Sequence, residues 1–90
     1  MITALDYIKA HEEPIEAAIA KLVKQVSPSL KTRGYSNTVI QYSDDLKGAL
    51  DVIGEKATDI FSENQWRLVY VCDHENNILR VSISIDKTQI

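Results

Sequence analysis

The chain has 90 residues, of which 44% are hydrophobic and 26% are charged, and its formal net charge is −3. This size allows one domain with a modest core, and the composition excludes an intrinsically disordered chain. The negative charge opposes binding to nucleic acid or anionic lipid, and no apolar segment approaches the roughly 20 residues that span a bilayer. Cys72 is the only cysteine, which suits a reducing compartment, so we expect a cytoplasmic protein. No motif indicates a cofactor or a membrane anchor.

The first predicted element is an amphipathic helix over residues 3–26, in which apolar residues recur at spacings of three and four. Pro14 interrupts this pattern, because an internal proline lacks an amide donor and crowds the carbonyl four residues back, at a cost of about 3 kcal/mol. We therefore expect the helix either to kink near Pro14 or to restart with Pro14 in its first turn, where proline is favoured. A restart would also take Glu12 out of the apolar stripe.

Residues 27–37 form the next predicted segment, a connection, because Pro28 and Gly34 break the helical periodicity. Residues 38–42 follow as a short predicted strand, since they are β-branched and aromatic with partial alternation. This strand would be the first of the sheet.

A second helix is predicted over residues 44–62, because Ser43 and the two aspartates after it are a strong helix-start signal. Gly54 lies at the edge of the apolar face of this helix, where the absence of a side chain could allow close approach to a sheet. The apolar residues on one face of a 3.6-residue period are Leu46, Ala49, Leu50, Ile53, Ala57, Ile60 and Phe61.

A β-hairpin is predicted over residues 66–86, from two strand-like runs separated by a polar segment. The second run alternates strictly between apolar and polar residues, which fixes its core side. The residues on that side are Leu79, Val81, Ile83 and Ile85.

The turn of this hairpin is predicted at Asn76 and Asn77, since asparagine tolerates the positive φ of a type I′ turn. Counting outward from such a turn places Asp73 opposite Arg80 on the outer side and Cys72 on the core side. A four-residue loop would leave these faces unchanged, whereas an odd loop length would swap the faces of the first strand.

Together these elements predict a small single α+β domain with the order α-β-α-β-β. Its sheet would have three, mainly antiparallel strands and would end in the C-terminal hairpin, with two amphipathic helices packed on it. The strand–helix–strand unit is expected to cross over in the right-handed sense.

Cys72 and His74 are the one pair of neighbouring side chains with the chemistry of a catalytic or metal site. They are two residues apart on a predicted strand and so share one face, where they could act as nucleophile and base. A zinc site needs three or four ligands, and the only other histidine, His11, belongs to the N-terminal helix. No spacing singles out a further ligand, and a lone cysteine on an apolar strand face most often serves as a small hydrophobe. We therefore predict no catalytic and no metal-binding residue.

Two surfaces are predicted to bind a protein partner. The second helix presents an acidic ridge that suits a basic partner, although such helix faces are often only solvated; its residues are Asp51, Glu55 and Asp59. The first hairpin strand is apolar on both faces, and its candidate residues are Trp66, Arg67, Val69 and Val71. The alternative for this strand is that the N-terminal helix covers its outer valines within the domain, which would make three layers.

A basic patch is the only feature that suits nucleic acid, and it consists of Lys21, Lys24, Lys31 and Arg33. The patch is small and discontinuous in the sequence, and it has neither a glycine-rich phosphate loop nor a helix-turn-helix pattern. Nucleic-acid binding is also opposed by the net charge.

The favoured function is that of a non-catalytic intracellular module that binds a larger protein, as a small inhibitor, an antitoxin-like or immunity-like factor, or an adaptor. It rests on the acidic ridge, the two-sided apolar strand and the lack of an assembled catalytic constellation. The alternatives are a nucleic-acid-associated accessory protein that uses the basic patch, and a small enzyme that uses Cys72 and His74. A homodimer is also compatible with the heptad-like spacing of the N-terminal helix, although Pro14 and Glu12 interrupt that spacing.

Overall fold

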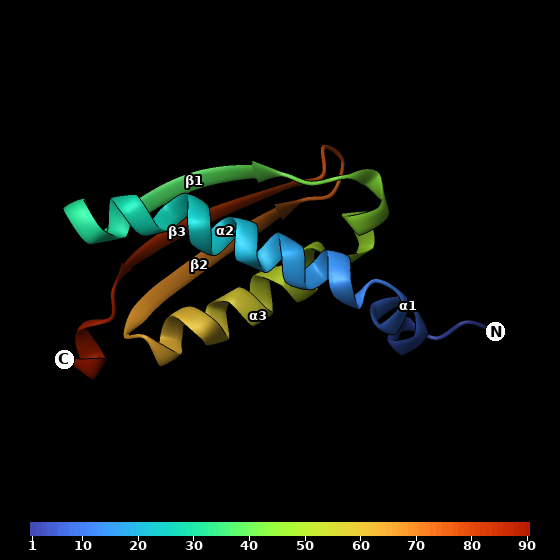
Figure 1. Cartoon of the computed structure of the whole chain (residues 1–90), viewed down its shortest axis with the longest axis horizontal. Helices are drawn as coiled ribbons and strands as arrows, with labels where there is room; N and C mark the ends of the chain where they lie inside the picture. Colours follow the sequence, from blue (N-terminus) through green and yellow to red (C-terminus); the bar gives the residue numbers. More distant parts are fainter.

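The computed structural model describes residues 1–90 and shows helices packed on a three-stranded antiparallel sheet (Figure 1). The α+β class is confirmed. The element order is α-α-β-α-β-β, since two helices stand where one was expected at the N-terminus. The helices are α1 (Ala4–Ala10), α2 (Glu12–Arg33) and α3 (Leu50–Glu63), with short 3-10 turns η1 (Asp44–Ala49) and η2 (Lys87–Gln89). The strands are β1 (Ser36–Gln41), β2 (Trp66–Asp73) and β3 (Ile78–Ile85).

The N-terminal helix stops and restarts before Pro14, which confirms the second of the two expectations, a restart with Pro14 in the first turn. His11 ends α1, and its backbone carbonyl accepts the first bond of α2, from Ile15 N at 2.9 Å. Pro14 is the third residue of α2, so its missing N–H falls in a turn whose amides have no helical partner. Thr3 caps α1 through a capping box with Asp6.

The predicted connection over residues 27–37 is wrong in its first part, because α2 continues through Pro28 to Arg33. Val26 and Leu30 extend the apolar face of the helix and are 1% and 8% exposed, so packing on the sheet outweighs the proline penalty of about 3 kcal/mol. Gly34 then ends the helix with φ 76°, and its N–H bonds to Leu30 O at 3.1 Å. The strand β1 consequently begins at Ser36, two residues before the predicted start.

The second predicted helix consists of two parts, the 3-10 turn η1 and the α-helix α3. Its predicted apolar face is buried except at Ile60, which is 38% exposed. Gly54 faces the Tyr70 ring of β2 so closely that a Cβ atom would stand 2.6 Å from it. The expectation that Gly54 allows close approach to the sheet is therefore confirmed.

The strands are arranged in the order β1-β3-β2, so the hairpin strand β3 lies between the two others. In the hairpin, Cys72 pairs with Leu79 and Val71 with Arg80, a shift of two residues from the predicted register. The predicted pairing of Asp73 with Arg80 is thus wrong, because the loop spans residues 74–77 instead of two residues. Within this loop only Asn77 has a positive φ, of 55°. An even loop length preserves the predicted faces, and Leu79, Val81 and the inner residues of β2 point to the core.

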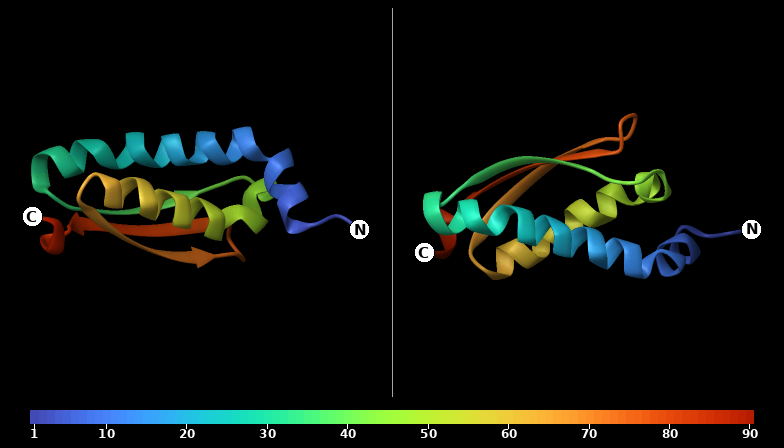
Figure 2. Two further views of the ribbon diagram at one scale, coloured as in Figure 1. Left: turned by 90° about the horizontal axis from the view of Figure 1, so that it is seen from below. Right: turned by 45° about the horizontal axis from the view of Figure 1, so that its top comes forward.

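The fold has two layers, because α2 and α3 lie on the same side of the sheet (Figure 2). The helix α2 packs on β1, and α3 packs on β2. Between the layers lies one core cluster, and the fully buried side chains in it include Ile15, Leu22, Leu50, Ile53 and Leu79. The alternative in which the N-terminal helix covers the outer valines of β2 is wrong, since no element of the chain lies on that face.

Candidate functional site

The open face of the sheet carries three exposed valines around one arginine. Strand pairing aligns Val39 of β1, Arg80 of β3 and Val71 of β2 in one row across the sheet. The neighbouring row contains Asn37, Ser82 and Val69, listed here in strand order. The exposed fractions of Val39, Val69 and Val71 are 50%, 52% and 60%. We call this surface, with Asn37, Arg80 and Ser82, the open-face patch.

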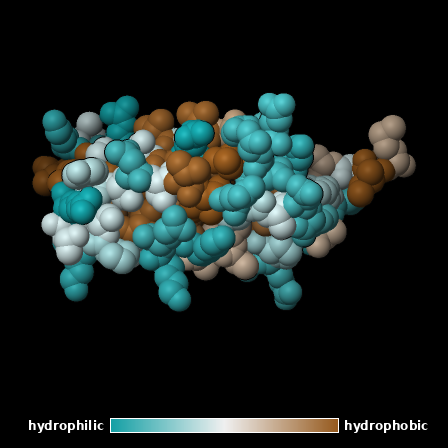
Figure 3. Space-filling model, turned by 90° about the horizontal axis from the view of Figure 1, so that it is seen from above, coloured by the Kyte–Doolittle hydropathy of each residue, from teal (hydrophilic) through white to brown (hydrophobic).

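The open-face patch is hollowed at its centre. Ser82 has a small side chain on the middle strand, and a depression of about 380 Å³ is bordered by the three valines and Arg80. The Arg80 guanidinium makes no hydrogen bond or ion pair within the chain. Figure 3 looks down on the molecule from the side of β1 and shows hydrophobic side chains gathered in the middle of the surface, with hydrophilic ones beside them.

The four candidate residues of β2 fall on opposite sides of the strand. Arg67, Val69 and Val71 point to the open face, whereas Trp66 points to the helices and packs against the core cluster. Trp66 is therefore separated from the other three, as the period of two along a strand requires. The Asp73 carboxylate, next to the patch, accepts hydrogen bonds from the backbone and side chain of Asn76, and these bonds lower its pKa.

The three acids of the predicted ridge are exposed, as expected, but they face different surroundings. Each spacing of four residues turns a helix position by about 40°, so Asp51, Glu55 and Asp59 spiral around α3. Asp51 contacts Cys72 and His74 at the end of β2, and Glu55 lies near enough to Tyr70 for its charge to raise the pKa of that phenol, after the larger effect of burial. Asp59 lies beside a groove between α2 and α3.

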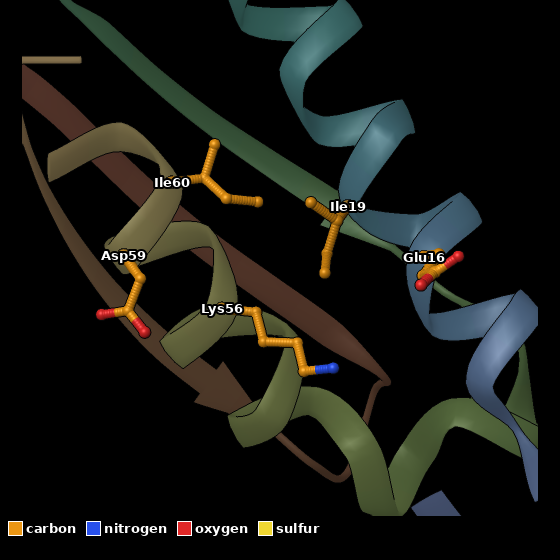
Figure 4. A pocket seen from close by; sticks show the side chains of 5 residues that line it. All are labelled: Glu16, Ile19, Lys56, Asp59 and Ile60. Atoms are coloured by element: carbon orange, nitrogen blue, oxygen red, sulfur yellow. The ribbon is translucent and has the colours of Figure 1, made fainter. Parts of the chain in front are cut away.

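This groove is one of several further hollows on the surface and has a volume of about 350 Å³. Figure 4 shows Ile19 of α2 and Ile60 of α3 facing one another across it, while Lys56 extends toward α2 and Asp59 turns outward. Glu16 borders the groove on α2 but forms no ion pair with Lys56. The groove combines side chains of both charge signs with two isoleucines, whereas the open-face patch has three valines and no acidic residue.

Cys72 and His74 meet a third polar side chain that the sequence did not indicate. The Cys72 thiol donates to Asp51 Oδ1 at 3.3 Å, and His74 Nε2 lies 3.3 Å from Asp51 Oδ2. Burial, followed by the hydrogen bond to Asp51 and the charge of Asp51, raises the pKa of the Cys72 thiol to about 12. At neutral pH this thiol is therefore protonated, which is the opposite of what a nucleophilic cysteine requires.

The four basic residues are exposed and follow one another along α2. Lys21 extends over the ring of Tyr42, with its Nζ 5.8 Å from the ring centroid. Lys24 and Lys31 are two helical turns apart on the outward side of α2, and Arg33 is the last residue of the helix. From Lys21 to Arg33 the basic residues are spread over about 18 Å of the helix.

Val39 and Arg80 belong to the open-face patch but were missed as site residues. The alternation of residues 38–42 contained the signal for Val39, because Ile40 is buried and its neighbour must point outward. The position of Arg80 between two valines depends on the pairing of β1 with β3, for which the sequence has no local signal.

Comparisons with protein-family models, with curated proteins and with solved structures found no match for this chain. None of its helices combines the length and the apolar character needed to cross a membrane.

Proposed function

We propose that this chain is a non-catalytic intracellular module that binds a larger protein through the open-face patch, as a small inhibitor, an antitoxin-like or immunity-like factor, or an adaptor. One observation carries the proposal: three half-exposed valines surround Arg80 on a sheet face that no helix covers. Contiguous apolar surface framed by polar residues is typical of protein interaction sites.

The chemistry of the patch indicates what the partner presents. The valines favour apolar side chains, and the unpaired Arg80 guanidinium favours a carboxylate, which it can hold in a bidentate geometry. A charged group left without a partner in such an interface would be costly, so the carboxylate would contribute specificity as well as affinity. The partner surface is therefore apolar with an acidic residue at its centre.

A second copy of the chain fits this surface less well. A two-fold dimer centred on the hollow would bring the Arg80 groups of both copies together, and like charges at a buried contact oppose association. The acidic residues of α3 suit a basic surface, as expected from the sequence, but they lie on the helical layer, where Asp51 also contacts Cys72 and Asp59 borders the groove.

The protonated state of the Cys72 thiol supports a non-catalytic role, because burial and Asp51 raise its pKa to about 12. The thiol donates its hydrogen bond to the Asp51 carboxylate, and His74 lies 3.3 Å from that carboxylate, so the acid and not the imidazole contacts the thiol. A cysteine nucleophile needs the imidazole in that place.

The experiment that tests the proposal compares variants of the immobilised chain in capture from the native source, with quantitative mass spectrometry. Arg80→Glu and the double variant Val69→Ser/Val71→Ser alter the open-face patch, and Lys24→Glu is the matched charge-reversal control on the outer side of α2. We expect one partner that the wild type and Lys24→Glu retain equally and that both patch variants lose by about tenfold or more.

The partner then provides the decisive measurement. Reversal of one acidic residue of the partner to lysine should restore its binding to Arg80→Glu, because the charges of the pair are exchanged. Equal retention by the wild type and both patch variants would reject the open-face patch. Loss of binding only when Asp51, Glu55 and Asp59 are all changed to lysine would assign the contact to α3 instead.

A further inference from the structure

Three metal-ligating side chains of different chemistry converge where the end of β2 meets the first turn of α3. Asp51 comes from that turn of the helix, Cys72 from the last residues of β2, and His74 from the loop that follows. Their donor atoms, a carboxylate oxygen, a sulfur and an imidazole nitrogen, all lie within 4.8 Å of one another. We propose that they form a binding site for one zinc-class divalent metal ion.

The distances already approach those around a tetrahedral ion. With metal–ligand lengths of about 2.0–2.3 Å, the donor atoms of a zinc site stand roughly 3.3–3.6 Å apart. Asp51 Oδ1 lies 3.3 Å from the Cys72 sulfur, and Asp51 Oδ2 lies 3.3 Å from His74 Nε2. For one carboxylate oxygen to bind the ion together with the other two atoms, His74 must move toward Cys72 and toward that oxygen, which it can do because about half of its side chain is exposed.

The donor set selects the class of metal. Thiolate, imidazole and carboxylate together suit zinc, whereas magnesium and calcium prefer sites made of oxygen atoms. Zinc would take the place of the thiol proton, which passes to solvent, and a water molecule would complete the fourth position. The Cys72 sulfur is half-buried and the other two side chains are more exposed, so an ion can enter from solvent.

The site is separate from the proposed protein-binding function, since it lies on the helical side of the sheet and the open-face patch lies on the other. An ion held there would connect the hairpin loop to α3 in addition to the Asp51 contacts. Its role would therefore be to hold the hairpin end against the helix. This role can be measured without any knowledge of a partner.

The test is equilibrium binding of zinc to the purified full chain, followed by thermal unfolding. The wild type should bind one zinc ion per chain and unfold at a higher temperature with zinc than without it. Cys72→Ser, His74→Ala and Asp51→Asn should each weaken binding by at least about tenfold, since even outer partners of metal ligands contribute 10- to 100-fold. All three residues are at or near the surface, so these variants retain the core.

Two matched control variants distinguish this site from nonspecific zinc binding to other side chains. His11→Ala removes the other histidine, and Asp59→Asn removes a carboxylate from the same helix, and neither should change the affinity. Cobalt bound to the wild type should show a sulfur-to-metal charge-transfer band that is absent in Cys72→Ser. The proposal would be overturned by a wild type that does not bind zinc up to submillimolar concentrations, or by a Cys72→Ser variant that binds it equally well.

Discussion

The two faces of β2 are built from similar residues but have opposite surroundings. Leu68 and Tyr70 point to α3 and the core, whereas Val69 and Val71 point to solvent. Leu68 is 6% exposed and Val71 is 60% exposed, although both are aliphatic and only three positions apart. A strand that is apolar on both faces is usually covered on both faces. The placement of the helices decides which of these faces is covered within the chain itself.

The largest expected effect is on the covered face. Leu68→Ala should lower the free energy of unfolding by about 2–5 kcal/mol, because it removes buried methyl groups and leaves a cavity. Val69→Ala on the open face should change it by no more than about 0.5 kcal/mol. Urea denaturation of both variants at low protein concentration measures the difference. An equal loss for Val69→Ala would show that the open face is covered in the isolated chain.

An intermediate effect is expected where α3 meets the inner face of β2. Gly54→Ala would place a Cβ atom 2.6 Å from the Tyr70 ring, and such overpacking should cost about 1–3 kcal/mol despite the better helix propensity of alanine. Gly48→Ala is the matched control, because its Cβ would meet the Tyr7 ring at an ordinary 3.7 Å. Chemical denaturation compares the two variants.

The Tyr70 ring itself provides the check on this explanation. In a Tyr70→Ala background, Gly54→Ala should cost far less, because the atoms that clash are gone. An unchanged cost would mean that the strain lies elsewhere in α3.

The smallest effect, about 1 kcal/mol at neutral pH, is expected for Tyr42→Phe on the covered side. The buried Tyr42 hydroxyl donates to Ala18 O at 3.1 Å, a bond that the variant loses. Burial raises the pKa of Tyr42 from 10.0 to about 12, so above pH 10 the unfolded chain holds fewer protons than the folded one. The stability that the wild type gains from this group is therefore complete below pH 10 and falls by about 1.4 kcal/mol per pH unit between pH 10 and 12.

The advantage of the wild type over Tyr42→Phe should accordingly vanish near pH 11. Urea denaturation of both proteins between pH 8 and 11 measures it. If the difference in the free energy of unfolding stayed constant across this range, the Tyr42 hydroxyl would be exposed to solvent in the folded protein, and the explanation by burial would be wrong.

Much of the fold was predictable from residues close together in the sequence. The apolar face of residues 44–62 predicted the buried side of η1 and α3 except at Ile60, and the alternation of β3 predicted its inner residues except Ile85, which is 48% exposed. The prediction failed at Pro28, which breaks the local pattern, because Leu30 continues the apolar face beyond it and packs in the core. The hairpin register was two residues out because the loop is longer than the two asparagines suggest.

The candidate sites were predicted in part. The valines of β2 were identified from their composition, but Val39 and Arg80 join them only through the pairing of β1 with β3. The acidic ridge was predicted as one surface, and its three exposed acids turn by about 80° in total along α3, so that Asp51 meets β2 and Asp59 borders the groove next to α2.

The sequence alone determined the types of element and the inward or outward direction of most side chains, because both follow from periods of 2 and 3.6 within a few residues. Only the tertiary structure decided that both long helices cover the same face of the sheet and that Val39, Arg80 and Val71 form one row. It also brought Asp51 to Cys72, 21 residues further along the chain. Such contacts depend on how complete elements pack, and no short-range pattern records that packing.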